Sequence, residues 1–210
     1  METGLSILSN DFSRLGDELK KYGRGPDFIH MDIMDGSFVP NLTFGPPLID
    51  SLRKITALLF EAHLMVVNPA EQWKWYKKSC GRIIFHIEAL REPQALLKEM
   101  KGVKKGIALN PATPAARIEK WLPYIETAFL MSVPPGFSGQ KFDSGVLEKI
   151  SRLRKIIDRK KLKCRICVDG GINLETAALC RGAGADSVVA SSYLSGGNIL
   201  KKLAALKALR

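Results

Sequence analysis

Side chains that could bind a metal ion and move a proton occur close together between Phe28 and Gly36. In an extended strand alternate side chains share a face, so His30, Asp32 and Met34 would point the same way. A histidine and an aspartate on one face, directly before a glycine-containing turn, make half of a metal site. For this stretch alone, the alternative is a strand end whose polar residues face solvent. The metal-site interpretation therefore depends on matching residues elsewhere in the chain.

Matching residues end two other strand-like segments. His63 lies near the end of one, and Asp169 ends another just before a pair of glycines. With His30 and Asp32 they offer two nitrogens and two carboxylates, a set that suits Zn²⁺, Fe²⁺, Mn²⁺ or Co²⁺. Asp32 and Asp169 facing each other over a substrate would allow a two-base proton exchange at carbon. The metal ion would offset the charge of the enediolate formed between the two steps.

The composition is that of an ordinary globular protein, with 46% hydrophobic and 25% charged residues among 210. One domain covering 1–210 is the natural expectation for this length. No stretch approaches the roughly 18 uncharged apolar residues of a membrane span, and the first residues do not resemble a signal peptide, so we expect a cytoplasmic protein. Cys164 and Cys167 have CxxC spacing but would face opposite sides of a strand, which favours free thiols over a zinc site.

The formal net charge of +11 raises the question of a nucleic-acid partner. The most basic region, 152–165, contains no aromatic residue for base stacking and no nucleic-acid-binding motif. It is typical of the solvated end of a helix, and we predict no nucleic-acid partner. The positive charge would instead help to attract an anionic substrate, an effect on rate and not on fold.

Eight apolar, strand-like segments alternate with eight helical patterns, which predicts parallel strands joined by right-handed crossovers. The expected strands are 5–8, 27–34, 58–66, 82–88, 105–110, 127–133, 163–169 and 186–191. The expected helices are 11–22, 46–55, 69–80, 93–101, 114–122, 144–159, 174–182 and 197–209. Eight such units in one domain favour a (β/α)8 TIM barrel over an open doubly wound sheet, which would carry a GxGxxG motif.

Active sites of such barrels lie at the carboxyl ends of the strands. His30, His63 and His86 are the three histidines of the chain, and each falls in the second half of an expected strand. Further polar residues end other expected strands: Ser6, Asp32, Glu88, Asn110, Ser132, Asp169 and Ser191. This convergence predicts a functional site at that end of the barrel.

Several motifs in one order resemble the ribulose-phosphate 3-epimerase family, from about Leu5 to Ser192. They are 6–9 with Asp11 and Phe12, 30–36 with 38–41, 63–65, 109–113, 131–133, 135–137 with Gly139 and Gln140, and 168–171. The resemblance implies a TIM barrel of the ribulose-phosphate-binding type and epimerisation of D-ribulose 5-phosphate to D-xylulose 5-phosphate at C3. It implies one divalent metal ion per subunit on His30, Asp32, His63 and Asp169, with Asp32 and Asp169 also acting as acid and base. It also implies a phosphorylated ketose as substrate and a homo-oligomer, either dimer or hexamer.

The resemblance implies roles for further residues as well. Ser6 would hydrogen-bond near the reacting centre, and Met34, Met65 and Met131 would bring polarizable sulfur against the enediolate, although methionine more often packs in a core. His86 would support the metal site without being a ligand. The residues expected to bind the phosphorylated substrate beyond these are Gly136, Phe137, Ser138, Gly139, Gly170, Gly171, Ser191 and Ser192.

Three of the phosphate-side residues depart from the family pattern. Pro134 stands where asparagine is common, and Ser138 and Ser191 stand where glycine is common. Pro134 removes one N–H donor, and the Ser191 hydroxyl would either obstruct the anion or replace a lost contact.

Other functions are open at this point. A hexulose 6-phosphate 3-epimerase, such as one acting on allulose 6-phosphate, would share the metal and acid/base set. The related decarboxylase/aldolase barrels carry a lysine in a D-x-K-x-x-D motif, and the corresponding Asp32-Ile33-Met34-Asp35 has none. Outside the enzymes, a non-catalytic sugar-phosphate-binding barrel would not need the opposed carboxylates, and a barrel recruited to RNA would bind it in a strongly salt-dependent way.

Overall fold

The computed structural model describes residues 1–209, and within them eight parallel strands form a closed barrel in sequential order. The strands are β1 (Glu2–Ser6), β2 (Phe28–Met34), β3 (Leu59–Met65), β4 (Arg82–His86), β5 (Lys104–Leu109), β6 (Thr127–Met131), β7 (Arg165–Asp169) and β8 (Ser187–Ala190). β8 pairs with β1 and closes the barrel. The (β/α)8 TIM barrel predicted from the sequence is thereby confirmed.

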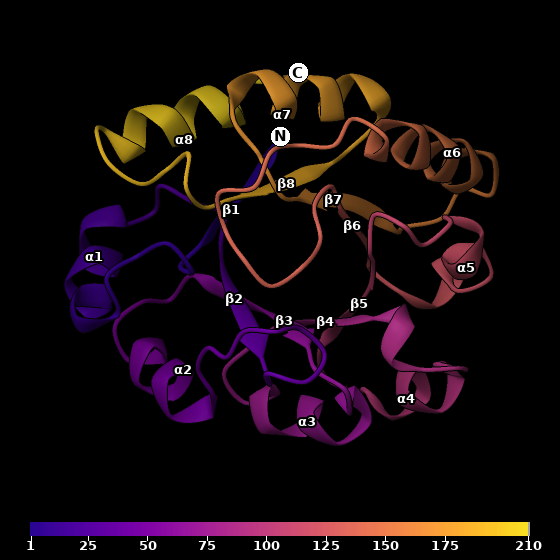
Figure 1. Cartoon of the computed structure of the whole chain (residues 1–210), viewed down its shortest axis with the longest axis horizontal. Helices are drawn as coiled ribbons and strands as arrows, with labels where there is room; N and C mark the ends of the chain where they lie inside the picture. The colour runs from indigo at the N-terminus through magenta and orange to yellow at the C-terminus, as the bar shows by residue number, and fades with distance from the viewer. Residues whose placement is uncertain (210) are drawn as a thin grey trace.

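Helices surround the strands as an outer ring (Figure 1). They are α1 (Leu15–Tyr22), α2 (Pro46–Arg53), α3 (Pro69–Tyr76), α4 (Gln94–Glu99), α5 (Ala116–Glu119), α6 (Val146–Arg159), α7 (Leu174–Ala183) and α8 (Ile199–Lys207), with the short 3-10 helices η1 (Phe12–Arg14), η2 (Ile87–Ala89) and η3 (Leu122–Tyr124). Pro46 and Pro69 occupy first-turn positions, where a missing N–H leaves no bond unmade. Asn173 caps α7 by accepting from the Thr176 backbone N–H at 2.9 Å.

The strands are buried on both faces, so two apolar cores lie back to back. Ile29, Met31 and Ile33 pack between the strands and the helices. Phe28 and Phe129 belong to a second cluster inside the barrel. The alternation along β2 therefore follows the prediction. His30, Asp32 and Met34 lie on one face of the strand, and Ile29, Met31 and Ile33 lie on the other.

The predicted boundaries differ from those in the structure at most elements, and three of the differences have a clear structural reason. The first strand runs from Glu2 to Ser6 instead of 5–8, because its early residues pair with β8 although they are not an apolar run. The predicted helix 114–122 is shorter, as α5 ends at Glu119 and η3 follows with Pro123 in its first turn. The predicted strand 82–88 ends at His86, and the next residues form η2, which turns Glu88 away from the strand line.

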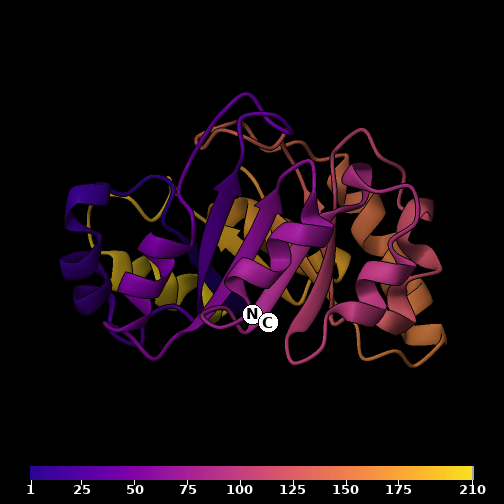
Figure 2. The same cartoon turned by 90° about the horizontal axis from the view of Figure 1, so that it is seen from below.

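Loops at the carboxyl ends of the strands rise above one end of the barrel, where chain from the β2–α2 and β6–α6 connections meets (Figure 2). The chain ends lie next to each other in the lower half of the molecule in Figure 2, away from these loops, and the Met1 ammonium donates to the Lys207 carbonyl at 2.9 Å. Among the helices of residues 1–209, none has both the length and the apolar character that crossing a bilayer requires.

Candidate active site

Three strands bring the predicted metal ligands together at the carboxyl end of the barrel. His30 and Asp32 come from β2, and the parallel register places Asp32 beside His63 of β3. Asp169 ends β7, which β8 and β1 separate from β2 around the barrel. One ligand atom from each of the four side chains lies within 4.8 Å of the others. Residues 139 positions apart in the chain thus converge on one point.

The contacts among the four side chains are short. His30 Nε2 lies 3.3 Å from an Asp32 oxygen and 3.8 Å from an Asp169 oxygen. His63 Nδ1 lies 3.2 Å from His30 Nε2 and 3.6 Å from Asp32. Both histidines are fully buried. Two imidazole nitrogens and two carboxylates thus aim at one small volume.

The far side of His30 is held by a buried ion pair. His30 Nδ1 lies 2.7 Å from Glu61 Oε1, and the other oxygen of Glu61 accepts from Arg82 at 2.7 Å. Burial alone would raise the pKa of Glu61, but His30 and Arg82 outweigh it and keep the pKa below its ordinary value. An ionised carboxylate only accepts, so His30 Nδ1–H donates to Glu61 and the other ring nitrogen, Nε2, faces Asp32.

The sequence reasoning missed both Glu61 and Arg82 as site residues. Glu61 precedes His63 by two positions, so the alternation of β3 places both inside the barrel. That spacing was a usable signal for Glu61. No comparable signal exists for Arg82, because its pairing depends on the register between β3 and β4.

The two aspartates differ in their proton affinity. Burial would raise the pKa of Asp32, but the adjacent His30 and His63 outweigh it and hold the pKa far below its ordinary value. Burial raises the pKa of Asp169 above its ordinary value, and the charge of Asp32 adds to that effect. One carboxyl group is therefore ionised while the other tends to keep its proton, a pairing suited to acid and base roles.

The donor set fits a divalent metal ion. Burial lowers the pKa of His63 to about 4, so this ring is neutral and able to ligate. For His30, burial opposes protonation, but Asp32 and Glu61 raise its pKa well above 6.5. A positive charge is thus favoured where the lone pairs converge. Histidine nitrogens and carboxylate oxygens in this arrangement suit Zn²⁺, Fe²⁺, Mn²⁺ or Co²⁺.

A cavity of about 500 Å³, open to solvent, lies over these side chains. Ser6 lines it and donates from Oγ to Asp32 Oδ2 at 2.6 Å, so the hydroxyl orients that carboxylate. The structure brings all the predicted substrate-side residues to the wall of this cavity: Ser6, Met34, Met65, Met131, Gly136, Phe137, Ser138, Gly139, Gly170, Gly171, Ser191 and Ser192. Their roles toward a substrate stay predictions.

Two loops meet at the rim of the cavity. Asn41 donates from its side-chain amide to the Gly136 carbonyl at 2.7 Å, which ties the β2–α2 connection to the β6–α6 connection. Gln140 donates to the Pro134 and Phe137 carbonyls and holds the second loop in a tight turn. The hydrogen bond from Asn41 explains how the two connections form one wall of the cavity.

Glycine is required where the β7–α7 connection passes the β6–α6 loop. Gly171 has a φ of +57°, and a Cβ there would lie 2.5 Å from the Phe142 backbone nitrogen. Gly170 and Gly171 thus line the cavity wall just before the α7 N-terminus, a suitable place for an anion. After the neighbouring strand β8, the Ser191 hydroxyl lies 2.8 Å from the Ser9 hydroxyl and 3.4 Å from the Ser6 carbonyl.

Fold and site together define a (β/α)8-barrel enzyme with a buried histidine–aspartate centre at the carboxyl ends of its strands. The family model for the "Ribulose-phosphate 3 epimerase family" matches residues 2–195. The chain belongs to this family, an isomerase family acting on carbohydrates, which confirms the resemblance seen in the motifs.

Curated relatives named ribulose-phosphate 3-epimerase match over most of their length. The protein of Chlamydia pneumoniae is 46% identical over 197 residues, covering 91% of this chain and 86% of that protein. The protein of Methanocaldococcus jannaschii is 43% identical and covers 100% and 90%. The protein of Bacillus subtilis is also 43% identical and covers 94% and 93%.

Among solved structures, a 3-hexulose-6-phosphate synthase matches with a TM-score of 0.71 at 15% identity, covering 100% of this chain and 99% of that one. A thiamine phosphate pyrophosphorylase from Pyrococcus furiosus matches with a TM-score of 0.64 at 15% identity, covering 99% and 94%. At this identity the likeness concerns the fold alone, and it agrees with the barrel.

Proposed function

We propose that the protein epimerises D-ribulose 5-phosphate and D-xylulose 5-phosphate at C3 by a metal-dependent, two-base mechanism. The observation that carries the proposal is the convergence of two carboxylates, Asp32 and Asp169, with His30 and His63 at the floor of a cavity, with one ligand atom from each side chain within 4.8 Å of the others. Family membership supports the substrate class.

The proton exchange follows from the states of the two groups. The ionised Asp32 removes the C3 proton from one face of the ketose, and Asp169 donates a proton to the opposite face. In the reverse direction the two exchange roles. Ser6 keeps the Asp32 carboxylate in one orientation through its hydrogen bond of 2.6 Å. Met34, Met65 and Met131 form an apolar wall that excludes water from the reacting carbon.

A metal ion fits the centre, and His30, Asp32, His63 and Asp169 would hold it as one ion per subunit. When bound, a divalent ion stabilises the negative charge that develops on the substrate oxygens. The four residues supply two imidazole nitrogens and two carboxylate oxygens. A bound cation would therefore balance the buried negative charge of the two carboxylates.

We assign phosphate binding to the part of the cavity lined by the glycine-containing loops after β6 and β7. Backbone N–H groups near Gly136–Gly139 and Gly170–Gly171, next to the α7 N-terminus, would hold the anion without a lysine. One domain over 1–210, a homo-oligomer, a cytoplasmic location and the lack of a nucleic-acid partner stay predictions from the sequence.

The test is a substrate panel combined with metal analysis. Purified protein should epimerise ribulose 5-phosphate at C3, lose activity with a chelator, and regain it with one of the four divalent ions. The panel includes allulose 6-phosphate and other six-carbon ketose phosphates. A preference for a hexulose 6-phosphate would overturn the pentulose assignment, and activity that survives complete metal removal would overturn the metal dependence.

A further inference from the structure

A second chain of hydrogen bonds lies behind His63, and the chemistry proposed above makes no use of it. His63 Nε2 lies 2.8 Å from His86 Nε2, and His86 Nδ1 lies 3.3 Å from Glu88 Oε2. The other oxygen of Glu88 accepts from the Asn110 backbone N–H at 2.8 Å. His63 and His86 are both fully buried. The chain thus connects the metal cluster to the connection after β5.

The direction of these bonds follows from the end of the chain. An ionised carboxylate only accepts, so Glu88 takes a proton donated by His86 Nδ1–H. A neutral His86 then has a lone pair on Nε2 and can only accept there. His63 must therefore donate from Nε2–H, which leaves the lone pair of His63 on Nδ1. That nitrogen is the one 3.6 Å from Asp32, in the metal cluster.

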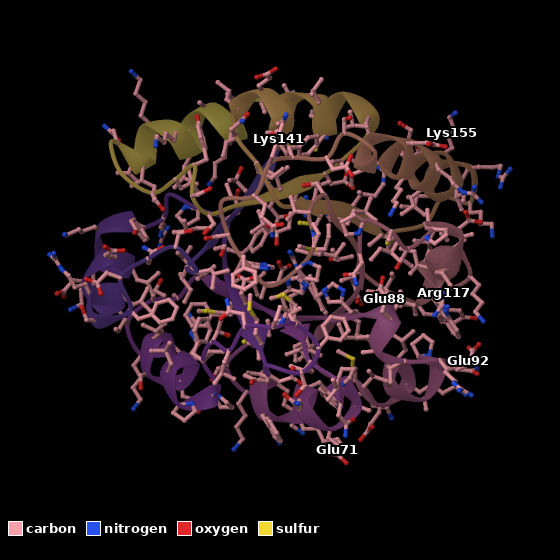
Figure 3. The ribbon with its side chains drawn as sticks, viewed as in Figure 1. Glu71, Glu88, Glu92, Arg117, Lys141 and Lys155 are labelled. Atoms are coloured by element: carbon pink, nitrogen blue, oxygen red, sulfur yellow. The ribbon has the colours of Figure 1, made fainter. Side chains whose placement is uncertain are left out.

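The chain is anchored by parts of the fold outside the cluster. The His86 ring stacks on His63 with 4.9 Å between ring centroids and contacts Phe38 at 5.0 Å. Lys149 of α6 donates to the Asn110 carbonyl at 3.1 Å, which holds the connection that supplies the N–H to Glu88. Glu88 lies on the inner side of the helix ring, whereas Glu71 and Glu92 lie at its outer edge (Figure 3).

We propose that His86 and Glu88 are positioning residues that hold His63 in its Nε2–H tautomer and so make Nδ1 its metal-ligating nitrogen. His30 presents the other ring nitrogen, Nε2, because Glu61 holds its Nδ1–H. The two histidine ligands are thus set by separate supports and use different nitrogens. The metal part of this inference rests on the proposed function, whereas the tautomer of His63 does not.

Glu88→Gln tests the direction of the chain. The Asn110 N–H still requires an acceptor, so the amide oxygen turns toward it and the amide NH₂ faces His86. His86 Nδ1 then becomes an acceptor, its Nε2–H donates, and His63 is forced into the Nδ1–H tautomer. The proton now occupies the ligating nitrogen. We expect metal affinity to fall by about 10- to 100-fold, the range for removing such outer partners.

The measurement is ¹⁵N NMR of histidine-labelled protein, without metal and with Zn²⁺, together with a metal-competition titration. With only three histidines in the chain, the ring signals are assignable from His86→Asn. The wild type should show His63 as Nε2–H, and Glu88→Gln should show it as Nδ1–H. Glu92→Gln is the matched control, because this glutamate is exposed and bonds only to Lys120 at 3.2 Å in the described chain.

A His63 protonated at Nδ1 in the metal-free wild type would overturn the inference, and so would unchanged metal affinity in Glu88→Gln. The wild-type spectrum decides the tautomer even if the variant does not fold. A wild type that binds none of the four ions would overturn the metal part of the proposed function, while the metal-free spectrum would still decide whether the hydrogen-bond chain sets the tautomer.

Discussion

At the scale of single residues, the site shows how environment separates two identical side chains. Asp32 is surrounded by two histidines and the Ser6 hydroxyl, which stabilise its charge. Asp169 lies where burial and the charge of Asp32 both favour its protonated form. Two aspartates with the same ordinary pKa thus acquire the different protonation states that an acid and a base need.

Replacing either aspartate by asparagine should nearly abolish epimerisation and leave the fold intact. General acid/base groups contribute about 10²–10⁴-fold to rate, and loss of a metal ligand adds to this. In D₂O the wild type should place deuterium at C3 of the product, and circular dichroism should show both variants folded. Full retention of the original C3 hydrogen would contradict the two-base mechanism.

The metal-free protein should become more stable at neutral pH in Asp169→Asn. Because the folded pKa of Asp169 is raised above its ordinary 3.8, ionisation costs wild-type stability progressively as pH rises above that value. Asparagine cannot ionise, so the variant escapes this cost. At pH 7 we expect the unfolding temperature of the variant to exceed that of the wild type by about 2–4 °C for each kcal/mol gained in the free energy of unfolding. Near pH 4 the two unfolding temperatures should match.

The His63 ring acts in the opposite sense and serves as an internal check. Its pKa is lowered from 6.5 to about 4, so the unfolded chain binds the proton more readily between these values and stability rises with pH there. In the wild type the two effects oppose each other across this range. In Asp169→Asn only the His63 effect remains, so a steeper rise of stability from pH 4 to 6.5 should appear. A variant less stable than the wild type at pH 7 would contradict the assignment.

At the scale of elements, the strands contribute buried charge as well as apolar surface. Glu61 of β3 and Arg82 of β4 lie inside the barrel, with exposed fractions of 0% and 5%, and pair at 2.7 Å. Arg82 also reaches Glu2 of β1 at 3.3 Å and stacks over the Phe28 ring. The Glu61–Arg82 pair therefore connects His30, at the candidate site, with Glu2 at the start of β1.

Breaking this pair should separate stability from metal binding. Arg82→Met leaves the buried Glu61 carboxylate without its arginine partner, with His30 on only one of its two oxygens, which should lower the free energy of unfolding by about 3–5 kcal/mol. The double variant Glu61→Leu with Arg82→Met should recover much of that loss, since apolar pairs often replace buried ion pairs without penalty.

Metal affinity should not recover in the double variant, because His30 has lost the acceptor that sets its tautomer. Denaturant unfolding of metal-free protein and metal-competition titration measure the two properties separately. Metal affinity at the wild-type level in the double variant would show that Glu61 does not orient His30.

At the scale of the whole molecule, the formal net charge of +11 favours attraction of the anionic substrate proposed above. Lys155 projects outward from α6, away from the cavity (Figure 3). Such distant charges act through the field of the whole protein, which raises the encounter rate with an anionic substrate and weakens with salt.

Raising the salt concentration should therefore lower kcat/KM for the sugar phosphate a few-fold and leave kcat almost unchanged. Steady-state kinetics at about 0.01 M and about 0.15 M salt, where the Debye length falls from about 30 Å to about 8 Å, measures this effect. The triple variant Lys155→Gln, Lys160→Gln and Lys163→Gln lowers the net charge from +11 by three, to +8, and should show a weaker salt dependence. An identical kcat/KM at both salt concentrations would contradict long-range attraction.

The sequence by itself determined the barrel and the four members of the histidine–aspartate cluster, His30, Asp32, His63 and Asp169. Alternating strand and helix patterns leave few topologies for parallel strands, and strand alternation assigns residues such as His30 and Asp32 to one face. Boundaries were less predictable where pairing, and not hydrophobicity, sets them, as at Glu2 in β1 and Glu88 in η2.

Only the tertiary structure decided which partner each histidine ring nitrogen has and which of the two aspartates is ionised. The Glu61–Arg82 pair, the His86–Glu88 chain and the bond between the Ser9 and Ser191 hydroxyls join residues whose proximity depends on strand register and on barrel closure. Protonation depends in turn on burial and on the charges brought near, so the difference between Asp32 and Asp169 arises only when β2 and β7 meet at one end of the barrel.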